Sequence, residues 1–259
     1  MRHLHLPLPS RRASGAASLA GRRVPRRARG QSMMELLVVF PVLVMLVFGI
    51  IQFSLIYRAR ATLNHAAFEA ARAGALHNGD SGAMRTALAV GLAPLYAGDP
   101  SASGVATAIA NATAEVKALG AAKVTVLNPT SAALSDFGRS RLDGQPGREL
   151  PSDTLNYRDV TLGGQSRLSV QDANILDIRV SYCYQLIVPL VDRVIVAVSN
   201  AMSVDSSLGE NGMSDPFGLY GSTSVQTDMC ANPLLPGRRL LITSSAMVRM
   251  QTPFFESNL

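Results

Sequence analysis

Glu35 is the residue whose charge and position first suggest chemistry, because it directly precedes a long apolar segment. Residues 36–57 form a run of 22 residues without a charge. An ionised carboxylate at the edge of hydrocarbon costs free energy unless it is paired, so Glu35 is expected to seek a cationic partner. The alternative is that Glu35 only marks a membrane interface, where the helix dipole favours a carboxylate near the helix N-terminus.

The two cysteines, Cys183 and Cys230, are the next candidates for chemistry. In an oxidising compartment a disulfide between them is expected, and it would join a predicted strand to the loop before the last strand. Two buried free thiols are the alternative. A zinc site is not expected, because the chain has four histidines and two of them, His3 and His5, lie at the start of the sequence.

Catalytic motifs are absent from the sequence. It contains no G-x-S-x-G nucleophile elbow, no Walker loop, no G-x-G-x-x-G or H-E-x-x-H motif and no EF-hand spacing. Sequence order does not reveal a catalytic triad that is assembled in space. From the motifs we expect a protein that is not an enzyme and that holds no cofactor and no metal.

The apolar segment 36–57 has the length of a membrane-spanning helix. At 1.5 Å per residue, its 22 residues cover roughly the 30 Å hydrocarbon core of a bilayer. A core helix of a soluble protein would usually be shorter and carry a polar face, which Gln52 and Ser54 alone do not supply. Pro41 removes one backbone donor inside this helix. It is compatible with a tolerated kink or with a bend that is used in packing.

Charge indicates in which direction the chain crosses the membrane. Eight of the 24 basic residues are arginines within residues 1–30, which contain no acid, so residues 31–259 hold 16 basic and 18 acidic residues. The positive-inside rule then keeps the N-terminus in the cytoplasm and exports the chain beyond the span. The net charge of +6 therefore describes the leader, and a nucleic-acid partner is not expected.

The residues before the apolar segment resemble a processing site. Gly30, four further residues and Glu35 follow an arginine-rich leader, as in type IV pilins and pseudopilins. The resemblance implies that a prepilin peptidase cuts between Gly30 and Gln31, which makes Glu35 the fifth residue of the mature chain. The new amine at Gln31 would lie about one helical turn from this carboxylate. The Glu35 of one subunit would then pair with the amine of the next.

The similarity extends along the apolar segment. Phe-Pro-Val-Leu at 40–43, Phe-Gly-Ile-Ile-Gln-Phe at 48–53 and the alanine-rich sequence at 61–75 resemble the TadE-like family, the minor pseudopilins of the tight-adherence (Flp) pilus machinery. The resemblance covers roughly residues 29–76, and it departs at Leu36, where many members have Tyr or Phe. The implied partners are the prepilin peptidase, other pseudopilins and pilus assembly platform proteins, and the lipid bilayer.

A second cleavage site offers an alternative. Ala59-Arg60-Ala61 follows the apolar segment where a signal peptidase would cut and release a secreted domain. The apolar stretch is longer than the roughly 7–15 residues of a signal h-region, and Arg58 and Arg60 place positive charge where such sites avoid it. In this alternative the chain is a periplasmic binding module or enzyme that uses the helix only as a signal or as a plain anchor.

Helical patterns dominate the chain just after the span. The first helix is expected to continue to about residue 77, and further helices are predicted from about 81 to 92 and over 103–119. Small and apolar residues at three- and four-residue steps form one stripe along the first helix. The stripe is expected to pack onto its own domain, and packing onto a neighbouring subunit is the alternative. This stripe consists of Leu63, Ala66, Ala67, Ala70, Ala71 and Gly74.

Strand patterns follow in the second half of the chain. Residues 123–127, 176–188 and 239–250 read as strands, whereas 191–201 fits a strand or a short helix. Residues 130–171 read as loops with short elements. Helices followed by strands predict an α+β fold with an antiparallel sheet, as in pilins.

These observations divide the chain into three parts. Residues 1–30 are a basic leader that is removed, residues 31–79 are the transmembrane helix and its extension, and residues 80–259 are a periplasmic α+β domain with a loop over 203–232. We expect a single-pass protein of the inner membrane with a cytoplasmic N-terminus. Its expected function is that of a TadE-like pseudopilin, a structural component of pilus assembly.

Overall fold

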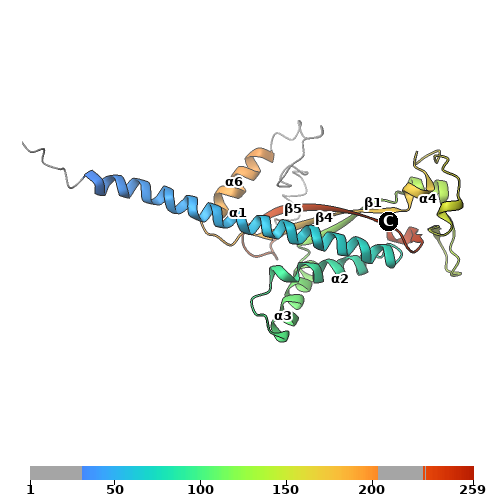
Figure 1. Ribbon diagram of the computed structural model, residues 1–259, viewed down its shortest axis with the longest axis horizontal. Helices are drawn as coiled ribbons and strands as arrows, with labels where there is room; N and C mark the ends of the chain where they lie inside the picture. The colour runs from blue at the N-terminus through green and yellow to red at the C-terminus, as the bar shows by residue number, and fades with distance from the viewer. Residues whose placement is uncertain (1–30, 204–229, 231) are drawn as a thin grey trace, which may run out of the picture. The chain divides into compact units, whose positions relative to one another are not determined.

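The computed structural model describes residues 31–203, 230 and 232–259 (Figure 1). Within these residues the chain forms a long N-terminal helix, short helices and antiparallel sheets, so the predicted α+β class is confirmed. Contacts divide the chain into two units, residues 1–42 and 43–259. The predicted leader and nearly all of the predicted loop over 203–232 lie outside the described residues.

The first helix, α1, runs from Gln31 to Leu76 and continues through Pro41. Within the described residues it is the one helix that is long and apolar enough to cross a membrane. Nearly all of its large apolar side chains from Met33 to Phe53 are exposed. Such a surface is unfavourable in water and is compatible with a single-pass membrane anchor.

The second half of α1 is buried along the predicted stripe of small residues. A Cβ atom on Gly91 would lie 2.7 Å from the Cα atom of Ala66, so the two helices approach each other at backbone distance. A Cβ on Gly74 would likewise meet side chains of Met84 and Leu176. The prediction that the stripe packs onto its own domain is therefore confirmed. The stripe residues with no exposed surface are Leu63, Ala66, Ala67, Ala70 and Ala71.

Two helices and two short helical turns follow α1 before the first strand, and one of these turns is a 3-10 turn over Ala93–Leu95. Side-chain caps fix where the two helices begin. Helix α2 spans Ser81–Leu92, and the carboxylate of Asp80 accepts a hydrogen bond from the backbone N–H of Ala83 (2.7 Å). Helix α3 spans Ala102–Thr113 and is capped by Ser101. A π-helical turn over Ala114–Ala118 completes the segment that the sequence predicted as one helix over 103–119.

The larger sheet has the strand order β1-β4-β5 and is antiparallel throughout. Its strands are β1 (Ala122–Asn128), β4 (Ile175–Gln185) and β5 (Arg239–Arg249). Strands β4 and β5 pair without a break along eleven residues each. Alternate residues of β4 form its buried face: Leu176, Ile178, Val180, Tyr182 and Tyr184.

One prediction in this region is wrong in its end point, and one open alternative is resolved. The strand predicted over 176–188 ends at Gln185, which pairs with Arg239, the first residue of β5. Beyond this pair, Leu186 donates to the carbonyl of Arg238 (2.9 Å), and Val188 donates to the side chain of Gln52 in α1 (2.9 Å), so the chain leaves the sheet. The ambiguous segment 191–201 forms a helix, α6 (Val191–Ser203).

The segment predicted as loops with short elements has that character. A small antiparallel sheet of order β2-β3-β6 joins this segment to the C-terminal tail, which contributes β6. The backbone N–H groups of Gln251 and Thr252 both donate to the carbonyl of Ala75, which ties the tail to the end of α1. The elements are α4 (Ser131–Phe137), β2 (Arg139–Ser140), β3 (Arg148–Leu150), a 3-10 turn (Leu155–Tyr157), α5 (Val170–Ala173) and β6 (Phe254–Phe255).

Candidate functional site

The predicted processing segment lies at the start of α1. Gln31 is the first residue of the helix, Glu35 follows one turn later with its side chain exposed, and Pro41 is exposed within the helix. Gly30 lies outside the described residues. No hydrogen bond or ion pair joins the Glu35 carboxylate to any residue within the described part of the chain. The cleavage, the pairing of Glu35 and the kink at Pro41 stay predictions.

Gln52 is where the domain attaches to the apolar part of α1. Its side chain is fully buried, and its Oε1 atom accepts a hydrogen bond from the backbone N–H of Val188 (2.9 Å). Ile56, one turn further on, is 5% exposed. The sequence showed Gln52 only as an isolated polar residue in an apolar run. Its partner lies 136 residues away, so no local pattern could have revealed this role.

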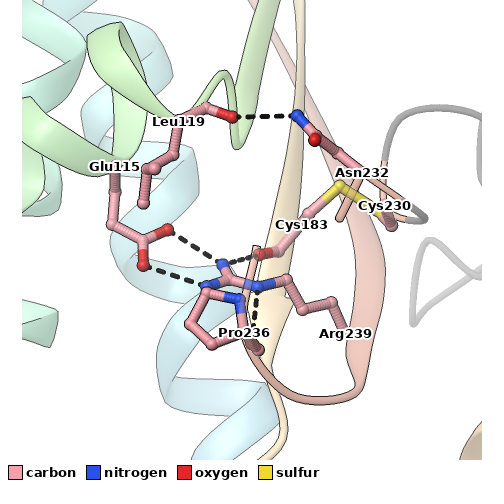
Figure 2. The surroundings of a disulfide bond; sticks show 7 residues. All are labelled: Glu115, Leu119, Cys183, Cys230, Asn232, Pro236 and Arg239. Atoms are coloured by element: carbon pink, nitrogen blue, oxygen red, sulfur yellow. Dashed lines mark hydrogen bonds and ion pairs between the residues drawn. A yellow bond between two sulfur atoms is a disulfide. The ribbon is translucent and has the colours of Figure 1, made fainter. Parts of the chain in front are cut away.

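A disulfide joins Cys183 to Cys230 (Figure 2). Cys183 lies in β4 with no exposed surface, and the two Cα atoms are 5.5 Å apart. The bond connects the central strand of the larger sheet to the chain before β5, across a sequence separation of 47 residues. These are the two cysteines between which a disulfide is expected from the sequence.

Arg239 forms a buried polar cluster next to this disulfide (Figure 2). Its Nη1 and Nη2 atoms donate to the two carboxylate oxygens of Glu115 at 2.9 and 3.0 Å. Nη1 also donates to the carbonyl of Cys183 (2.9 Å), and Nε donates to the carbonyl of Pro236 (3.3 Å). Such bidentate pairing fixes the guanidinium in one orientation. The cluster therefore links the π-helical turn, β4 and the start of β5.

Two tyrosines lie beside this cluster. The hydroxyl oxygens of Tyr96 and Tyr182 are 2.6 Å apart. Burial raises the pKa of Tyr96 to about 12, and burial also raises the pKa of Tyr182. Both hydroxyls are thus neutral at ordinary pH and serve as hydrogen-bonding groups rather than as bases.

The hydrogen bonds of Arg239 hold three elements together. The charged groups of the cluster, the Arg239 guanidinium and the Glu115 carboxylate, are paired with each other. Over the described ranges, no three His, Cys, Asp or Glu residues come together in a way that could hold a metal ion. The sequence did not single out Glu115 or Arg239. The available signal was weak: one acid in an alanine-rich helix, and one arginine at the start of an apolar strand.

The fold and the apolar segment define the general class of the protein. It is an α+β domain whose N-terminal helix is compatible with a single-pass membrane anchor. Residues 30–72 match the family model of TadE-like proteins, which confirms the resemblance based on the processing segment and the alanine-rich stripe. The match covers the first 42 residues of α1 and leaves out the sheets. No curated protein and no solved structure matches the chain.

Proposed function

We propose that this chain is a TadE-like pseudopilin, a membrane-anchored structural component of tight-adherence pilus assembly. The observation that carries the proposal is the family match over residues 30–72, which includes Gly30, Glu35 and the apolar segment. It supports a pilus-associated component. The further step is that a prepilin peptidase removes residues 1–30 and leaves Gln31 as the mature N-terminus.

Burial along α1 supports retention of the helix in the mature protein. Signal-peptidase cleavage after Ala61 would detach Gln52, Ile56 and Ala59 from the domain. These side chains are 0%, 5% and 0% exposed, so the domain would lose part of its core and expose the groups that covered them. A secreted domain that begins after Ala61 is therefore the less stable product.

Glu35 is the residue to which we assign an assembly role. Its exposed carboxylate lies one helical turn from Gln31, and it is unpaired within the described part of the chain. At the edge of a bilayer an unpaired carboxylate is costly, and an exposed salt bridge in water stabilises by only about 0–1 kcal/mol. A neighbouring subunit's N-terminal amine would supply the missing charge in a less polar environment.

The proposed location follows from the same features. The arginine-rich leader keeps the N-terminus cytoplasmic, α1 spans the inner membrane, and residues 80–259 face the periplasm. A disulfide between Cys183 and Cys230 fits that oxidising compartment. The proposed partners are the prepilin peptidase, related pseudopilins and the pilus assembly platform.

Processing is tested by a substitution at the cleavage site. Gly30→Val should block cleavage when the full chain is co-expressed with a prepilin peptidase, and the product should retain about 30 additional residues on a gel. Gly21→Val, which changes another glycine of the leader, is the matched control and should be processed normally. Two outcomes would contradict the proposed processing. One is that the Gly30→Val chain is still cleaved at the same position, and the other is that neither variant is cleaved.

The assembly role is tested separately at Glu35. Glu35→Ala should enter the membrane in normal amounts and yet fail to support pilus formation, because the N-terminal amine of the neighbouring subunit loses its counter-charge. Glu35→Asp keeps the charge and should retain more piliation than Glu35→Ala. Equal piliation in both variants and the unchanged chain would remove the assembly role from this residue.

A further inference from the structure

Four apolar side chains are exposed on α6 and on the turn before it. Ile187 is 67% exposed, Leu190 62%, Val194 42% and Val198 47%, and we call this set the α6 surface. Its members follow one another at steps of three, four and four residues. Val194 and Val198 are therefore one turn apart on the same side of the helix.

The same apolar stripe of the helix also has a packed part. Val191 is 5% exposed, and Ile195 packs against the hydrophobic core of the domain. The α6 surface is the part of this stripe, together with the turn before it, that the domain leaves exposed. Exposed apolar surface of this kind marks contacts with a membrane or with another protein.

Leu190 has an unusual backbone conformation for an exposed leucine. Its φ angle is +71°, in the left-handed region that residues with a branched side chain adopt only at an energetic cost. Glycine or asparagine would meet the same turn with less strain and without exposing an apolar side chain. Backbone strain of this kind persists where the surrounding structure holds it in place, and it is common at functional sites.

The turn before α6 contacts α1 at a definite height along that helix. Val188 lies next to Ile187, and its backbone N–H donates to Oε1 of the buried Gln52 (2.9 Å). Just before Gln52, α1 exposes Ile50 and Ile51 by 60% and 45%. The stretch from Met33 to Ile51 rises about 28 Å at 1.5 Å per residue, close to the thickness of the hydrocarbon core. The outer edge of the membrane would then lie near Gln52, several residues before the predicted end of the span at Tyr57.

The charged groups next to the α6 surface fit a position at that edge. Next to the α6 surface, Asp192 forms an ion pair with Arg238 (3.1 Å), and the Arg238 side chain is 45% exposed. Charged groups at the rim of an apolar face suit the headgroup region.

We propose that the α6 surface inserts into the outer leaflet of the membrane that α1 spans. This second contact would hold the domain against the bilayer and fix its rotation about α1. The proposal rests on the proposed anchorage by α1. Lipid is the material that would cover the α6 surface, because the residues of α1 next to this surface belong to the segment that is itself expected to contact lipid.

The absence of tryptophan from the sequence allows a direct test. Full-length chains with single substitutions Leu190→Trp or Val194→Trp are reconstituted into phosphatidylcholine vesicles, with and without bromine on the upper acyl chain. Insertion should lower tryptophan emission at least about twofold in the brominated vesicles. Val160→Trp, at a position 70% exposed in the segment between β3 and α5, is the matched control and should be unaffected.

A fourth variant separates this proposal from the anchorage on which it rests. Leu46→Trp, at a position 60% exposed within α1, should be quenched by bromine placed deep in the acyl chain. Quenching of Leu46→Trp without quenching of Leu190→Trp or Val194→Trp would overturn the α6 proposal alone. A blue-shifted but unquenched Leu190→Trp would also overturn it, since a protein partner would then cover the surface. If Leu46→Trp is unquenched as well, the anchorage is wrong. Folding of each variant is verified by its Cys183–Cys230 disulfide.

Discussion

Breaking the buried ion pair between Glu115 and Arg239 should destabilise the domain strongly. The Arg239 side chain is 1% exposed and the Glu115 side chain is 15% exposed. Glu115→Gln keeps the size of the side chain but leaves a buried guanidinium without its counter-charge. Removing one partner of a buried pair lowers the free energy of unfolding by about 3–5 kcal/mol. Because Glu115 is partly exposed, we expect a loss of about 3 kcal/mol, at the lower end of this range. With a urea m-value of about 2 kcal/mol/M, the unfolding midpoint should fall by about 1.5 M.

Pulse proteolysis of the detergent-solubilised full chain across a urea series measures this midpoint. Arg158→Gln is the matched control, because Arg158 pairs with Asp153 at the surface with side chains 32% and 50% exposed. That change should cost no more than about 1 kcal/mol. The double variant Glu115→Leu with Arg239→Met should recover most of the loss, since it removes both charges. Equal midpoints for Glu115→Gln and Arg158→Gln would refute the reasoning.

Three further predictions use the same urea measurement. Replacing Cys183 and Cys230 with serine should cost about 4 kcal/mol by loop-closure entropy, and an unchanged midpoint would show that the disulfide does not stabilise the domain. Gly91→Ala should cost about 1–3 kcal/mol because its Cβ meets α1 backbone at 2.7 Å, whereas Gly98→Ala, which meets nothing within 4 Å, should be nearly neutral. Burial raises the pKa of Tyr96 from 10.0 to about 12. The neutral Tyr96 hydroxyl therefore contributes its full stabilisation below pH 10 and loses it as the pH rises to 12. Tyr96→Phe should make the urea midpoint fall less steeply between pH 10 and 12, and an unchanged slope would contradict this contribution of Tyr96.

Features written in local sequence patterns were predictable. The stripe from Leu63 to Gly74 has helical spacing and is buried along α1. The helix predicted to begin near residue 81 begins at Ser81, where the carboxylate of Asp80 caps it. The alternation from Leu176 to Tyr184 predicted which residues share one face of β4, and that face is buried. In each case a short-range pattern determines which side of an element is apolar.

Features that depend on distant partners were not predictable. Glu115 and Arg239 are 124 residues apart, and neither lies in a sequence motif that indicates the other as its partner. The strand predicted to reach residue 188 stops at Gln185, which pairs with Arg239, the first residue of its partner strand. The apolar residues from Val194 to Val198 show no alternation, so periodicity could not separate strand from helix, and tertiary contacts decide for α6.

The identity of the mature N-terminus tests the central claim most directly. The natural protein is extracted from membranes, and its first residues are determined by N-terminal sequencing together with intact mass. We predict that the mature chain begins at Gln31, with residues 1–30 removed and α1 retained. A chain that begins at Met1, or one that begins after Ala61, would contradict it.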